Sequence, residues 1–156
     1  MEHVPDQGSG LRLPDIEQLD RDLRNTRLPG AHFSITPQDL STVAGLVDGT
    51  YSVPSPIFAL VAALRGLGIT LDEMCRLCGS SLAAGPMLGE CTLRLDSDLK
   101  VGIAYRTEVT LHGIDRKFSA VRGVIDRFRF SVVLFLPGSG RVAEVDLTWL
   151  LPRGPA

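Results

Sequence analysis

The chain has 156 residues, of which 44% are hydrophobic and 22% are charged. This composition suits one globular domain with its own core and excludes a disordered chain. Sixteen basic and eighteen acidic residues give a formal net charge of −2, so the basic excess typical of nucleic-acid-binding proteins is absent.

The sequence also indicates where in the cell the protein is located. The chain has three cysteines, too few for a secreted disulfide framework. The N-terminal residues lack the apolar stretch of a signal peptide. The longest apolar run, 57–64, is far shorter than the ~20 residues that cross a bilayer. We therefore expect a cytoplasmic protein with no membrane segment.

The N-terminal residues 1–30 are poor in apolar side chains and are expected to form a partly ordered leader. A short helix around 14–24 is one interpretation, because Pro14 and the acidic residues suit a first turn. A mobile leader that packs loosely is the other. The folded domain is expected to span 31–153.

Three helices are predicted after a short strand at 32–35. Thr36 and Pro37 begin a helix that ends at Asp48-Gly49, and Thr70 caps another that runs to Leu77. Between them, 57–67 reads as a helix that is apolar on nearly every face and therefore buried.

The second half of the chain has the alternation of strands. Strands are expected at 91–95, 101–114, 118–136 and 142–150, with a kink at Gly123 and a hairpin turn at 137–140. The fold class is therefore α+β, with one antiparallel sheet and helices on one face. A sheet curled round the buried helix is the hotdog architecture.

Two further patterns have a structural and a functional interpretation. Cys75 and Cys78 have the spacing of a redox motif or of two zinc ligands. However, they lie at the end of a helix and lack further ligands, so we expect them to pack in the core and to bind no metal. A run of basic residues is either a solvated face or a contact for phosphates or an acidic carrier protein. The run consists of Arg116, Lys117, Arg122, Arg127 and Arg129.

Several segments, in this order, resemble the MaoC-like hotdog dehydratases, in particular their N-terminal or fungal-synthase-type variant. The resemblance covers about residues 31–153. Its segments are Phe33-Ser34-Ile35-Thr36, Asp39-Leu40, Asp48-Gly49-Thr50, Pro54-Ser55-Pro56-Ile57-Phe58, Leu99-Lys100-Val101-Gly102-Ile103-Ala104-Tyr105 and the stretch from Asp115 to Asp126.

The resemblance implies a dehydratase or hydratase acting on acyl thioesters of coenzyme A or carrier protein, without a cofactor. In that family the Asp and His of an Asp-x-Asn-Pro-x-His motif hold a water and exchange protons with the substrate. Amides at the start of the buried helix polarise the thioester carbonyl.

This sequence departs from that motif. Anchored on Asp48, the Asn, Pro and His positions hold Thr50, Tyr51 and Val53. Anchored on Ser55-Pro56-Ile57, the Asp and His positions hold Val53 and Phe58. Neither alignment supplies the histidine, so fold and activity are separate inferences.

Five residues form the candidate site. Asp48 is the surviving acid, although Asp before Gly also serves a turn. Tyr51 either donates a proton or orients a water, or it is simply a packed side chain. The amides of Ile57 and Phe58, with Ser55, form either an oxyanion site or an ordinary capped helix end.

We therefore expect a hotdog subunit that is either an active dehydratase or a catalytically degenerate partner. It should form a homodimer or a heterodimer with another hotdog subunit, because a long sheet edge needs cover. An acyl-binding scaffold and a hotdog thioesterase are the alternatives. The helix at 57–67 carries no acid, which disfavours the thioesterase.

Overall fold

A computed structural model describes residues 13–46 and 54–154. Within these ranges no helix is long and apolar enough to span a membrane. The elements, in chain order, are α1 (Ile16–Leu23), β1 (Arg27–Leu28), β2 (His32–Ser34), α2 (Pro37–Leu46), α3 (Ile57–Arg65), α4 (Leu71–Leu77), a 3₁₀ turn (Leu82–Ala84), β3 (Met87–Leu95), β4 (Ala104–Ser119), β5 (Gly123–Leu136) and β6 (Gly140–Gly154).

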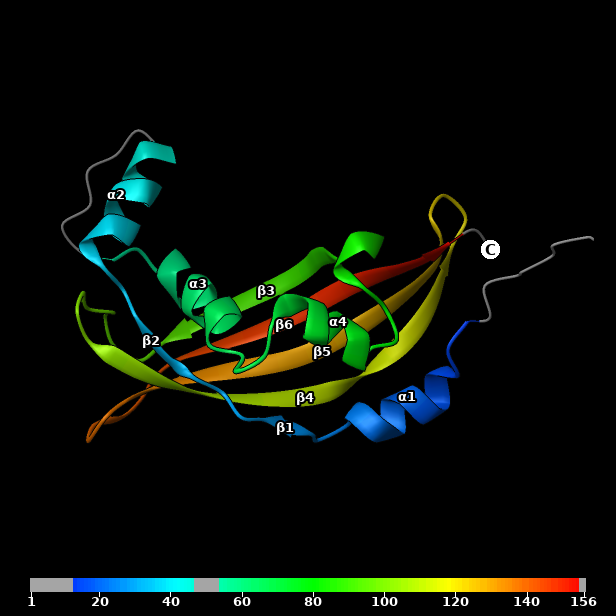
Figure 1. Cartoon of the computed structure of the whole chain (residues 1–156), viewed down its shortest axis with the longest axis horizontal. Helices are drawn as coiled ribbons and strands as arrows, with labels where there is room; N and C mark the ends of the chain where they lie inside the picture. The colour runs from blue at the N-terminus through cyan, green and yellow to red at the C-terminus, as the bar shows by residue number, and fades with distance from the viewer. Residues whose placement is uncertain (1–12, 47–53, 155–156) are drawn as a thin grey trace, which may run out of the picture.

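One antiparallel sheet runs in the order β1-β4-β5-β6-β3, and β2 also pairs with β4 (Figure 1). Alternate residues of its strands form an apolar inner face. At its centre the Phe130 ring lies 5.3 Å from Phe128 and 5.2 Å from Trp149, measured between ring centroids. The predicted α+β class is confirmed.

The inner face of the sheet carries α3 and α4, and the strands bend around them (Figure 1). Phe58 and three alanines of α3 are buried, while Leu60, Val61 and Leu64 pack against the core. The predicted buried helix is therefore confirmed, but it ends at Arg65 rather than at residue 67, because Gly66 caps it. In contrast, α2 extends away from the sheet and buries no residue.

Thr107 of β4 ties the end of α3 to the sheet edge. Its buried hydroxyl accepts from the Ala31 amide at 2.8 Å and donates to the Gly66 carbonyl. A Cβ on Gly66 would lie 2.4 Å from the Thr107 methyl carbon. Only glycine therefore allows this close approach of helix and strand.

Helix α1 confirms the N-terminal helix predicted around 14–24. Asp15 caps it by accepting from the Glu17 and Gln18 amides. The helix packs along β4, and Asp20 accepts from the Ile114 amide at 2.9 Å. Residues of the expected leader thus cover one edge of the sheet.

One predicted strand is wrong. The stretch 118–136 is not a single strand with a kink, because β4 continues to Ser119 and β5 begins at Gly123. Gly123 has a φ of 71°, which places it in the turn of a hairpin. The strand predicted at 32–35 is found at His32–Ser34, and the capped helix at 70–77 is found as predicted. The helix after Thr36 begins as predicted, and its predicted end at Asp48-Gly49 lies outside the described residues.

Candidate functional site

The start of α3 is the described part of the candidate site. The helix begins at Ile57 and Pro56 occupies the N-cap without a side-chain hydrogen bond. The predicted Ser55 cap is therefore wrong. Proline fits this position because its fixed φ suits a helix start and its missing N–H has no intrahelical partner there.

The two amides proposed as an oxyanion site are not equivalent. The Phe58 N–H donates to the Ser55 carbonyl at 3.0 Å, so the expectation that it is free is wrong. Among the described residues no acceptor forms a hydrogen bond with the Ile57 N–H. The Ile57 side chain is 41% exposed, whereas the Phe58 ring is 1% exposed and belongs to the core.

Asp48 and Tyr51 lie outside the described residues, so their proposed roles stay predictions. The described chain stops at Leu46, at the end of α2, and resumes at Pro54, just before α3.

Neither described histidine lies on the face of the sheet that carries α3. His32 pairs with Arg106 and His112 follows the buried Leu111, so both belong to the outer face. The His112 Nε2 atom lies 2.8 Å from the Ser131 hydroxyl. Within the described ranges this chain therefore brings no histidine to the start of α3.

An ion cluster that the sequence did not predict lies on the inner face at the far end of the sheet. The Asp126 carboxylate is fully buried and accepts from Arg116 at 2.7 and 3.0 Å and from Arg153 at 2.7 Å. Arg153 also donates to the Cys78 and Gly79 carbonyls behind α4. The hydrogen bond to Asp126 raises the pKa of Arg116 above its ordinary value.

The basic run therefore divides between two environments. Arg116 is largely buried with Asp126, which corrects the interpretation of the whole run as one solvated face or one contact for phosphates. On the outer face, Arg127 donates to Asp115 at 2.8 and 3.1 Å, and Lys117 and Arg129 lie within 4 Å of the same carboxylate.

Cys75 and Cys78 are packed in the core, as predicted. Burial raises the pKa of the Cys78 thiol to about 12 and also raises that of Cys75. Thiols with raised pKa values are poor nucleophiles and poor metal ligands. In the part of the chain that the structure describes, no group of His, Cys, Asp and Glu has the arrangement of a metal site.

Comparison with known proteins establishes the fold. No protein family model and no curated protein sequence matches the chain. Among solved structures, the ChsH1–ChsH2 complex from Mycobacterium tuberculosis matches with a TM-score of 0.61 at 16% identity, covering 90% of each chain.

Two further structures agree. The HadBC 3R-hydroxyacyl-ACP dehydratase complex from the same organism has a TM-score of 0.61 at 13% identity, over 84% of this chain and 98% of that one. A MaoC-like dehydratase from Rhodospirillum rubrum has a TM-score of 0.52 at 15% identity, over 87% and 97%. The chain has the hotdog fold of these proteins, as its motifs predicted.

Proposed function

We propose that this chain is a subunit of a hotdog dehydratase or hydratase that acts on an acyl thioester of coenzyme A or a carrier protein. The observation that carries the proposal is a fold shared with two dehydratase structures over more than four fifths of the chain. The thioester carbonyl would lie at the start of α3, where the Ile57 amide and the partial positive charge of the helix end favour an oxyanion.

The two edges of the sheet differ, and this difference supports pairing with a second hotdog subunit. The β4 edge is covered from Ala104 to Ile114 by β2, by the Ala31 carbonyl, by β1, by residues 25–26 and by Asp20. Among the described residues no segment pairs with the outer side of β3. An open edge of nine residues is a template for another strand.

The partner would be a second copy or a different hotdog chain. ChsH1–ChsH2 and HadBC are complexes of two chains, which supports the second arrangement. The missing motif histidine favours it too, because a partner that carries Asp and His would complete the chemistry. Asp48 is the acid that this chain would contribute if it is itself the catalyst.

Hydration of an enoyl thioester by the purified chain tests these versions. If the chain is the catalyst, Asp48→Asn should abolish turnover and leave the thermal midpoint nearly unchanged. If it is a partner subunit, the isolated chain should show no turnover, and activity should appear when a hotdog subunit with the full motif is added. Full activity of the isolated Asp48→Asn protein would contradict both versions.

A further inference from the structure

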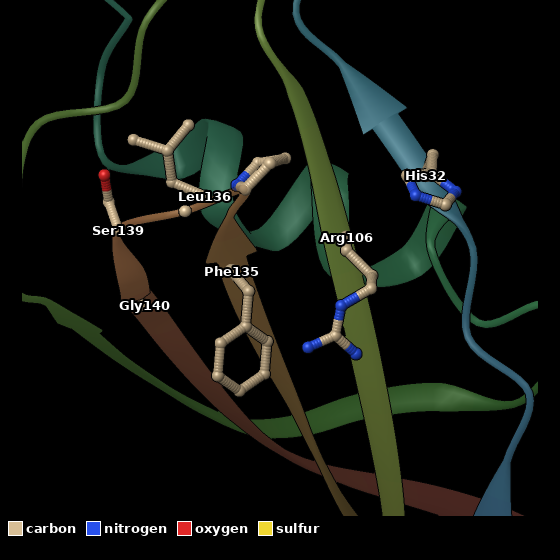
Figure 2. Close-up of a pocket in the computed structure, with 8 residues that line it drawn as sticks. His32, Arg106, Phe135, Leu136, Ser139 and Gly140 are labelled. Atoms are coloured by element: carbon tan, nitrogen blue, oxygen red, sulfur yellow. The ribbon is translucent and has the colours of Figure 1, made fainter.

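A hollow of about 350 Å³ opens on the outer face of the sheet, opposite α3 (Figure 2). This turn pocket is lined by His32 of β2, Arg106 of β4, Phe135 of β5 and the turn residues 136–140. The register places His32 beside Arg106 and Arg106 beside Phe135. The three side chains therefore start from one row across three adjacent strands.

The charge of the turn pocket favours an anion. Its lining contains Arg106 and His32 and no carboxylate. Arg106 donates to Glu108 at 2.6 Å, but both side chains are nearly half exposed, so water screens this pair. Among the described residues, no other acceptor meets the Arg106 guanidinium and none meets the His32 ring. Their remaining N–H groups are available to a ligand.

The pocket also has a surface for a flat ring. The guanidinium carbon of Arg106 lies 4.7 Å from the centroid of the Phe135 ring, and Figure 2 shows the two groups next to each other. The two flat groups therefore lie close enough together to offer one surface on which a ring can stack. In the turn, Gly138 and Gly140 leave open space where a Cβ would stand, so the backbone is accessible.

We propose that the turn pocket binds a phosphorylated nucleoside. Phosphate oxygens accept hydrogen bonds from Arg106 and His32, and the base stacks on the plane formed by Arg106 and Phe135. An anion-binding group or a stacking surface alone suits many ligands. A nucleotide has both an anionic phosphate and a flat base, and this row of side chains can bind both at once. The inference concerns the face opposite α3 and does not rest on the proposed activity.

Calorimetric titration with AMP tests this site. The wild-type chain should bind AMP, and Arg106→Gln should weaken binding about tenfold or more, because it removes the charge-assisted contacts. Phe135→Leu should weaken binding about threefold through the lost stacking partner. The control is Arg94→Gln, because Arg94 lies on the same face and also pairs with a carboxylate, that of Asp146 at 2.5 Å, but does not line the turn pocket. This variant should bind like the wild type.

Three results would overturn the proposal: no AMP binding at millimolar concentration, equal weakening by Arg94→Gln and Arg106→Gln, or inorganic phosphate or adenosine binding as tightly as AMP. Coenzyme A as a second titrant identifies the source of the nucleotide. Tighter binding of coenzyme A than of AMP supports a site for the nucleotide end of a larger molecule, and equal affinities support a site for a free nucleotide. These titrations measure binding and need no turnover, so their outcome is independent of whether the chain hydrates thioesters.

Discussion

The carboxylate of Asp20 lies where β4 has no neighbouring strand to bond its Ile114 amide. It accepts that N–H at 2.9 Å, pairs with Arg24, and fills the space beside Gly113, where a Cβ would lie 2.2 Å from its Oδ1 atom. The hydrogen bond with Arg24 is the largest cause that lowers the pKa of Asp20. The hydrogen bond from the Ile114 amide and the nearby positive charges lower it further. One acidic side chain thus replaces a missing strand.

Asp20→Ala should lower the free energy of unfolding by about 1–3 kcal/mol, because the Ile114 amide loses its acceptor. The folded-state pKa of Asp20 lies below its ordinary value, so its carboxylate stabilises the fold above the unfolded-state pKa. This stabilisation is lost as the pH falls through the folded-state pKa. Urea unfolding between pH 7 and pH 3 should show the difference shrinking toward acid. Asp20→Asn, which retains an acceptor oxygen, should lose less, and a difference independent of pH would contradict this role.

The Cys78 thiol should be inert in the folded protein. Its pKa of about 12 leaves almost no thiolate at pH 8, and burial excludes reagents. Alkylation at pH 8 followed by mass spectrometry should leave Cys75 and Cys78 unmodified in the native chain and modify both in urea. Native labelling of Cys78 at the rate found in urea would contradict core packing.

At the level of elements, helix and strand patterns were predictable where local signals agree. Thr70 caps α4 as the sequence indicated, and Glu73 completes a capping box with it, because both partners lie within one turn. The hairpin at Gly123 was missed because apolar residues on both sides of it mimic one strand. Register and turn position are set by pairing between strands. The alternation of apolar residues within one strand carries no information about that pairing.

The packing of α3 is tested by Phe58→Ala. The ring is 1% exposed and lies in the core between helix and sheet, so its removal should cost about 3–5 kcal/mol. The neighbouring Ile57 is 41% exposed, so Ile57→Ala should change stability by less than about 1 kcal/mol. Denaturant unfolding measures both. Equal losses would contradict the orientation of α3.

At the level of the whole molecule, the candidate site was only partly predictable. The sequence located α3 and its first residues, but the Ser55 carbonyl that occupies the Phe58 amide follows from the turn geometry at Pro56. The buried cluster around Asp126 joins β4, β5 and the end of β6. Residues so distant in sequence meet only through the fold, and nothing in the spacing of Arg116 and Arg153 predicts their contact.

Pairing of this hotdog subunit through β3 depends on which amides of that strand face the open edge. Asp96 donates its N–H to Val142 of β6, so in an alternating strand the amides of Cys91, Leu93 and Leu95 point away from β6. Cys91→Pro removes one outward donor and retains the bonds to β6. In contrast, Thr92→Pro removes an amide that bonds to β6, so it should detach β3 from the sheet. It is the matched control because it places proline at the neighbouring position but disrupts the fold itself.

Light scattering after size exclusion measures whether this pairing occurs. At high micromolar concentration, alone or mixed with a hotdog subunit that carries the full motif, the wild-type chain should form a complex heavier than its monomer mass of 16.8 kDa and heavier than the partner alone. Cys91→Pro should stay monomeric in both samples with unchanged circular dichroism. A wild-type chain that stays monomeric both alone and in the mixture, or a Cys91→Pro protein that forms the same complexes as the wild type, would contradict pairing through β3.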